Sequence, residues 1–196
     1  MVLVVHENRG LNPHIEDITR RLALEGYLAY APDALAVAGG YPGDEDKARE
    51  AFGKLDQTKA RADFVAATRA LLTLAEGSGK VGVVGFCYGG GMANYRATQV
   101  PELAAAVPFY GGQAPAAEVP KIKAPLLIHY AAQDDRINAG WPAFEAALKA
   151  ADTRYEGHFY PGTQHGFNND TTPRFDAEAA KLSWSRTLAF LKTHLS

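Results

Sequence analysis

Short apolar segments alternate with longer amphipathic segments along the whole chain. The short segments predict strands at Val2–His6, Tyr27–Ala31, Lys80–Phe86, Ala104–Tyr110, Pro125–Tyr130 and Tyr155–Tyr160. Helical patterns occupy Pro13–Leu24, Asp44–Ala75 (as one helix or two), Gly89–Thr98, Trp141–Ala151 and Phe175–Leu195. Apolar strands that alternate with helices are typical of an α/β fold, so we expect a mostly parallel sheet with helices on both faces.

The length and the start of the chain bear on its organisation. The 196 residues contain no repeat or linker and predict a single domain over residues 1–196. The loop Asp33–Asp44 is the one long irregular stretch, and we interpret it as a lid or as the rim of a pocket. The first predicted strand begins at Val2, and chains seldom begin inside their core sheet. We therefore expect that an N-terminal segment is missing.

Composition and charge exclude several classes of function. A net charge of -2 provides no basic field for nucleic acid or a membrane surface. The apolar runs are too short to span a bilayer, and no signal-peptide pattern is visible, so a cytoplasmic location is expected. One cysteine cannot form an internal disulfide. No HExxH or clustered Cys/His spacing occurs, so no metal site is predicted.

The segment VVGFCYGGG joins the third predicted strand to a helix and contains the chain's single cysteine, Cys87. Gly85 and Gly89 complete the pattern G-x-nucleophile-x-G, in which a strained turn lifts a nucleophile above the sheet. The turn presents the N–H of Tyr88 to an oxyanion, and the following helix end favours a thiolate. Two alternatives are a buried small hydrophobic residue and a dinucleotide-binding turn, although G-x-G-x-x-G is not matched.

A thiol nucleophile needs a base, and the base needs an orienting acid. Asp134 and His165 follow Cys87 in the order nucleophile, acid, histidine, and each comes just after a predicted strand. The carboxyl ends of parallel strands meet at one edge, where open α/β sheets build their sites. Asp135 is the rival acid. We prefer Asp134 because the spacing leaves Ile137 to anchor the following loop in the core.

The other histidines have simpler interpretations. His129 and His158 lie inside strands and are expected to be packed, and His14 and His194 lie near helix ends and are expected to be solvated. His6 closes the first predicted strand and is a secondary pocket candidate.

Four segments occur in order and cover essentially the whole chain: HENRGLNPHIEDITRRLALEGYLAYAPD, GFCYGGG, DDRIN and YPGTQHGF. Together they resemble the dienelactone hydrolase (carboxymethylenebutenolidase) family of the α/β-hydrolase fold. Members of that family usually carry an extra N-terminal segment with early strands. The resemblance implies a Cys-Asp-His triad of Cys87, Asp134 and His165, and it implies no cofactor.

The resemblance also assigns roles near the nucleophile. In the family, a glutamate after the first of these strands pairs with the resting thiol, and Glu7 occupies that place; the alternative is a surface carboxylate in a loop. The N–H of Asn8 would then join that of Tyr88 in the oxyanion hole. Family members that act on dienelactone hold its carboxylate with arginines, but Asn169 stands at one such position. Arg49 lies in the region of the second, where a solvated helix residue is the other interpretation.

The sequence therefore predicts a hydrolase that cleaves carboxylic esters or lactones through a thioester at Cys87. The partner is a small-molecule substrate, and monomer and homodimer are both open. Candidate pocket aromatics are Tyr88, Tyr110, Trp141 and Phe167, each of which could instead belong to the core. The alternatives are a thioesterase or small peptidase on the same fold, and a non-enzymatic ligand-binding relative with a redox-sensitive thiol.

Overall fold

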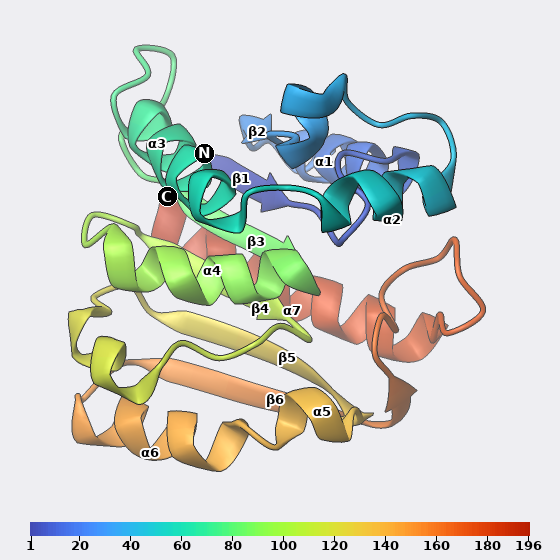
Figure 1. The fold of residues 1–196 in the computed structure, drawn as a ribbon. Coiled ribbons are helices and arrows are strands. Elements are labelled where there is room, and N and C mark those ends of the chain that lie inside the picture. Colours follow the sequence, from blue (N-terminus) through green and yellow to red (C-terminus); the bar gives the residue numbers. More distant parts are fainter.

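Six parallel strands form one sheet in the order β2-β1-β3-β4-β5-β6 (Figure 1). The computed structural model describes residues 1–196. The strands are β1 (Val2–Val5), β2 (Ala29–Tyr30), β3 (Gly82–Phe86), β4 (Ala105–Phe109), β5 (Leu126–Gln133) and β6 (Tyr155–Gln164). Every neighbouring pair is parallel.

Helices connect the successive strands. The α-helices are α1 (Pro13–Leu24), α2 (Glu45–Gly53), α3 (Gln57–Leu72), α4 (Tyr88–Gln99), α5 (Asp135–Asn138), α6 (Trp141–Ala150) and α7 (Ala177–Leu195). Two 3-10 helices, η1 (Ala34–Ala38) and η2 (Ala116–Lys121), lie in the connections after β2 and β4. None of these helices combines the length and the apolar character that a membrane crossing requires.

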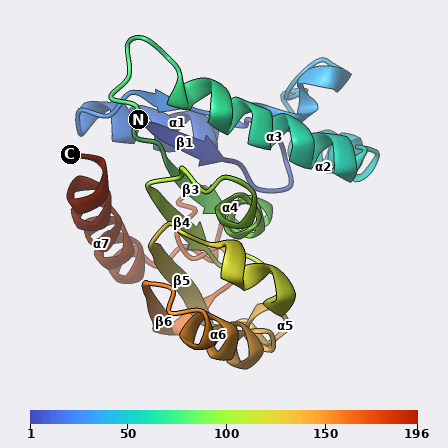
Figure 2. The same cartoon turned by 90° about the vertical axis from the view of Figure 1, so that its left-hand side faces the viewer.

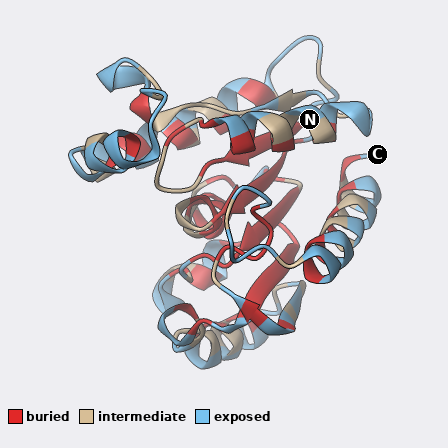
Figure 3. Cartoon of the chain, turned by 90° about the vertical axis from the view of Figure 1, so that its right-hand side faces the viewer, coloured by how far each residue is buried: buried red, intermediate tan, exposed pale blue.

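Helices cover both faces of the sheet: α1 and α7 lie on one side, and α3, α4 and α6 on the other (Figure 2). Side chains alternate across each strand. In β1, Val4 packs in the cluster that contains Leu191 of α7, whereas Leu3 packs in the cluster that contains Phe64 of α3. The central strands are buried while the helices expose their outer faces (Figure 3), and this burial on both sides accounts for the near-continuous apolar strands.

The path of the chain creates a crevice at one edge of the sheet. From β1 the chain passes outward through α1 to β2, and it then returns to place β3 on the other side of β1. Such a reversal of strand order leaves a crevice at the carboxyl ends of the two strands, where α/β proteins bind ligands. The loop after Val5 and the turn after Phe86 open into this crevice.

Several elements have bounds that differ from the predicted ones, and one prediction with two alternatives is decided. The segment expected as one or two helices is two, because Asp56 caps α3 by accepting from the N–H groups of Thr58 and Lys59. The edge strand β2 is only two residues long. Strand β6 continues to Gln164 instead of ending at Tyr160, so the histidine expected in the following loop comes directly after the strand.

The burial predicted for two histidines is wrong in one case and confirmed in the other. His14 was expected to be solvated, and this is wrong: its side chain is buried, and its Nδ1 lies 3.3 Å from Asp170 Oδ1. His129 is fully buried, as expected, with Nδ1 2.8 Å from the Tyr160 hydroxyl and Nε2 3.1 Å from that of Thr187. The position of a residue near a helix end does not reveal which face of the helix it occupies.

Candidate active site

The turn between β3 and α4 holds Cys87 in a strained backbone conformation, with φ of 56°. The turn requires glycine at positions 85 and 89, because a side chain at either position would clash with backbone atoms. A Cβ on Gly85 would lie 1.9 Å from the Gly89 carbonyl oxygen, and a Cβ on Gly89 would lie 2.1 Å from that of Val5. The pattern G-x-C-x-G thus lets β1, β3 and α4 approach closely while Cys87 projects into the crevice.

Two residues that line a cavity with Cys87 have backbone N–H groups without a backbone acceptor. Tyr88 is the first residue of α4, so its N–H has no acceptor within the helix, and it acts to lower the pKa of the Cys87 thiol. The N–H of Asn8, in the loop after β1, has no backbone acceptor. The N–H of Cys87 is engaged by the Phe109 carbonyl oxygen at 3.0 Å. Tyr88 and Asn8 are thus two residues at this edge of the sheet whose N–H groups have no backbone acceptor.

A carboxylate and an imidazole meet at the ends of β5 and β6. His165 Nδ1 lies 2.5 Å from Asp134 Oδ2 and donates to this carboxylate, so Nε2 is on the side of the ring away from Asp134. The other oxygen of Asp134 accepts from the N–H of Ile137 at 3.4 Å and caps α5. The ring of Tyr110 packs against His165 with centroids 5.0 Å apart. Asp135 is exposed in α5 and makes no contact of this kind.

Glu7 is held by a residue far away in the sequence. Asn169 Nδ2 donates to Glu7 Oε2 at 2.9 Å. The amide cannot turn easily, because its Oδ1 accepts from both the N–H and the hydroxyl of Thr171, at 3.0 and 2.6 Å. Asn169 is buried and Glu7 is half-buried, so the contact is partly shielded from solvent. A neutral amide thus positions Glu7 without cancelling its negative charge.

The resting thiol is neutral. Burial raises the pKa of Cys87 to about 11, and the negative charge of Glu7 acts in the same direction. The Tyr88 N–H and the guanidinium groups of Arg136 and Arg174 lower this pKa but are outweighed. The start of α4, which was expected to favour a thiolate, therefore does not produce one in the resting protein.

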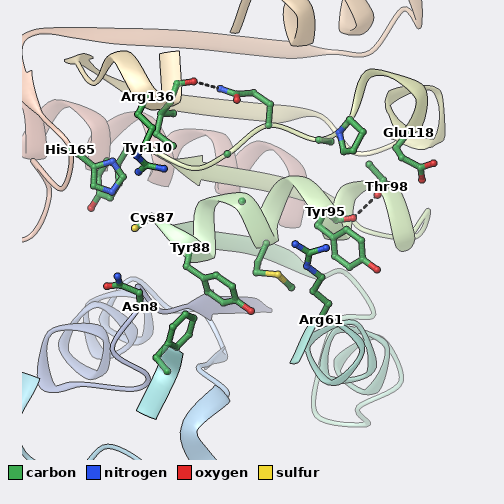
Figure 4. A pocket seen from close by; sticks show the side chains of 18 residues that line it. Asn8, Arg61, Cys87, Tyr88, Tyr95, Thr98, Tyr110, Glu118, Arg136 and His165 are labelled. Carbon is green, nitrogen blue, oxygen red and sulfur yellow. Dashed lines mark hydrogen bonds between the residues drawn. The ribbon is translucent and has the colours of Figure 1, made fainter. Parts of the chain in front are cut away.

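Two adjoining cavities open beside Cys87, with volumes of about 760 and 530 Å³. Both are lined by Asn8, Cys87, Arg136 and His165, so the thiol and the imidazole face the same space (Figure 4). The larger cavity continues along α4. The smaller one reaches the loop after β1 and includes Tyr41 of the loop that was expected to form a pocket rim.

Of the expected pocket residues, two line the larger cavity and three do not. Tyr88 and Tyr110 are in its wall. Arg49 lies on the exposed face of α2, 3.3 Å from Asp46, and is a solvated helix residue. Trp141 packs on the aromatic side chains of β5 and β6, and Phe167 is fully buried in the core. These three are therefore not placed to touch a substrate.

Four arginines that line the cavities were not singled out from the sequence, and one of them is Arg9 of the loop after β1. Arg136 follows Asp134 by two residues in the DDRIN segment and lines both cavities. Arg174, whose guanidinium lies against Gly166, lines the smaller one. Arg61 of α3 lines the far end of the larger one. Of these last three arginines, only Arg136 could have been noticed in the sequence, because it stands two residues after Asp134.

Comparison with solved structures identifies the fold as that of the α/β-hydrolases. A crystal structure titled as a provisional dienelactone hydrolase from Klebsiella pneumoniae aligns with a TM-score of 0.86 and 30% identity, over 97% of this chain and 85% of that one. A dienelactone hydrolase-like promiscuous phosphotriesterase from metagenomic libraries aligns with a TM-score of 0.84 and 25% identity, over 100% and 86%.

The family model described as "Dienelactone hydrolase family" matches residues 1–195. A provisionally named carboxymethylenebutenolidase of Saccharolobus solfataricus is 33% identical over 97% of this chain and 88% of its own length. The chain therefore belongs to the dienelactone hydrolase family and is a hydrolase that acts on ester bonds.

Proposed function

We propose that this chain hydrolyses small carboxylic esters or lactones through a covalent thioester at Cys87. The observation that carries the proposal is the 2.5 Å hydrogen bond between Asp134 and His165 beside the elbow that bears the only cysteine. This arrangement supplies nucleophile, base and orienting acid, and each proposed step uses groups of this chain and water alone.

The first half of the proposed reaction forms the thioester. The substrate carbonyl oxygen lies between the N–H groups of Asn8 and Tyr88. His165 Nε2 takes the thiol proton while the Cys87 sulfur attacks the carbonyl carbon, and the negative charge moves to the carbonyl oxygen. When this tetrahedral intermediate collapses, the carbon–oxygen ester bond breaks and the alcohol leaves with the proton from His165. The loss of one oxyanion donor typically costs about 3 kcal/mol of transition-state stabilisation.

The second half of the proposed reaction hydrolyses the thioester. His165 Nε2 takes a proton from water, whose oxygen attacks the carbonyl carbon of the acyl group. The carbon–sulfur bond then breaks, the carboxylic acid leaves, and the proton returns to the Cys87 sulfur. Asp134 holds His165 in the tautomer that both halves require and stabilises the imidazolium between them.

Glu7 controls the resting state in this proposal. Its charge, which Asn169 positions but does not neutralise, opposes the thiolate until a bound substrate changes the contacts of Glu7. Because thiolates are the form that oxidants attack, a neutral resting thiol also protects Cys87. The same property argues against a redox sensor, since sensor cysteines have a low pKa.

We propose carboxylic esters and lactones as the substrate class, without naming a particular compound. The relatives named for carboxymethylenebutenolidase and dienelactone hydrolase activity support an ester or lactone. Asn169 engages Glu7 and carries no positive charge. We therefore propose that the carboxylate of dienelactone is not held at this position.

The test is a burst experiment with p-nitrophenyl acetate, run on the unaltered protein beside Cys87→Ala and His165→Ala. The quenched proteins are analysed by mass spectrometry with peptide mapping. We expect an initial burst and an acetyl group on Cys87 in the unaltered protein, and neither in Cys87→Ala. Equal rates and no adduct in the unaltered protein and in Cys87→Ala would refute the thioester mechanism.

A further inference from the structure

The larger cavity continues beyond Cys87 as a groove along α4 (Figure 4). The residues of α4 that line it are Tyr88, Gly91, Met92, Tyr95 and Thr98. They recur three, four, seven and ten positions after the first, so they lie on one face of the helix. Ten positions at 1.5 Å rise correspond to a groove about 15 Å long. An acetyl group would fill only its beginning.

Much of the floor and walls of the groove is apolar, and the buried Tyr88 hydroxyl has no hydrogen-bond partner. Tyr88, Met92 and Tyr95 present rings and a thioether. On the opposite wall, Gln113 is fixed because its side-chain nitrogen donates to the Tyr130 hydroxyl at 3.0 Å and to the Ile137 carbonyl oxygen at 2.9 Å. The middle of the groove thus suits a chain of methylene or aromatic groups.

The far end of the groove carries one unpaired positive charge. The guanidinium of Arg61, from α3, lies 5.5 Å from the centre of the Tyr95 ring and forms no ion pair. The nearby carboxylate of Glu118 is already engaged by Lys121 at 2.6 Å. An anionic group that reached this end would meet Arg61, with the Glu118 carboxylate of the same cavity paired to Lys121.

The geometry of the proposed reaction sets which part of the substrate enters the groove. The leaving alcohol must accept a proton from His165, which lies at the opposite end of the cavity from Arg61, with Cys87 between them (Figure 4). The acyl group extends from the carbonyl carbon in the other direction. The acyl group therefore runs along α4 toward Tyr95.

We propose that this groove is an acyl-binding site for elongated acyl groups that are apolar along their length and end in an anionic group such as a carboxylate. The inference rests on the proposed thioester mechanism, and it names the substrate class of the same site. Arg61 recognises the terminal charge, and the α4 face recognises the chain.

The experiment uses pairs of p-nitrophenyl esters of equal acyl length, one ending in a methyl group and the other in a carboxylate, with chains from butyryl to dodecanoyl. Each methylene that enters the groove is expected to raise kcat/KM by about twofold. This factor corresponds to half of the free energy that a fully buried methylene would contribute. The preference for the carboxylate-ended ester is expected to appear only in the longer pairs.

Arg61→Met tests the terminal charge while keeping the length of the side chain. It is expected to lower the carboxylate preference of the long pairs by up to about fivefold, through KM, because the contact is partly exposed. Arg61→Lys should keep most of the preference. Arg69→Met, on the same helix but outside the cavity, is the matched control and should leave all rates unchanged.

The outcomes separate this inference from the proposed function. An equal preference in Arg61→Met and the unaltered protein, or rates that do not change with chain length, would overturn the acyl-site assignment. An acetyl adduct on Cys87 from p-nitrophenyl acetate would still support the thioester mechanism in that case. If no adduct forms with any ester, the proposed function itself fails.

Discussion

Replacing Glu7 by glutamine removes one of the two causes that keep the thiol of Cys87 protonated. The pKa of Cys87 lies at about 11 instead of 9.0, with burial as the larger cause and Glu7 as the second. We expect Glu7→Gln to lower this pKa by up to about one unit, which at pH 8 raises the thiolate fraction from about 0.1% to about 1%. The amide keeps the volume of the side chain.

The rate of alkylation by iodoacetamide measures this change, because the thiolate is the reacting species and the reagent is small and neutral. Its second-order rate constant, followed between pH 7 and pH 11 by mass spectrometry, should rise with pH in both proteins. The rise should come at lower pH in Glu7→Gln, with a rate up to about tenfold higher at pH 8.

Glu45→Gln is the matched control. Glu45 also lines the smaller cavity, where it accepts from the Tyr41 hydroxyl at 2.9 Å, but it is not among the groups that shift the pKa of Cys87. Its profile should follow that of the unaltered protein. If the profile of Glu7→Gln is unchanged, or moves to higher pH, then Glu7 does not hold the thiol neutral and its proposed role is wrong.

The remaining predictions concern stability, measured by urea unfolding. Gly89→Ala should destabilise the fold by about 3 kcal/mol, because its Cβ would lie 2.1 Å from the Val5 carbonyl oxygen; Gly91→Ala, with 3.5 Å of room, is the control and should lose nothing. Arg96→Met should stabilise it by about 1–2 kcal/mol, since the guanidinium is buried without a hydrogen-bond partner, and a lower midpoint would contradict this. Burial lowers the pKa of His129 well below 6.5, so only the unfolded chain gains this proton as pH falls below 6.5. Stability should decline there by up to about 1.4 kcal/mol per pH unit, and less steeply in His129→Gln.

Local patterns in the sequence determined the architecture and the elbow. Apolar runs of strand length that alternate with helical patterns predict a parallel sheet covered on both faces, because burial on two sides requires such strands. The conformation of a tight turn depends on its own few residues, so Gly85 and Gly89 identified the position of Cys87 in advance. Strand ends could also be predicted, and Asp134 and His165 follow two of them.

Contacts between distant segments were decided only by the tertiary structure. The choice of Asp134 over Asp135 depends on which carboxylate faces His165 after β5 and β6 pair. The bond between Asn169 and Glu7 joins residues 162 positions apart.

The burial of Cys87 and the positions of the arginines beside the cavities could not be predicted from the sequence either. The neutral resting state of Cys87 follows from its burial and from the charge of Glu7. Arg61 and Arg174 come from a helix and a loop whose place beside the cavities no local pattern specifies. The physical reason is common to all of these: local sequence sets the backbone conformation and the buried face of each element, whereas the facing side chain is supplied by whichever segment packs there.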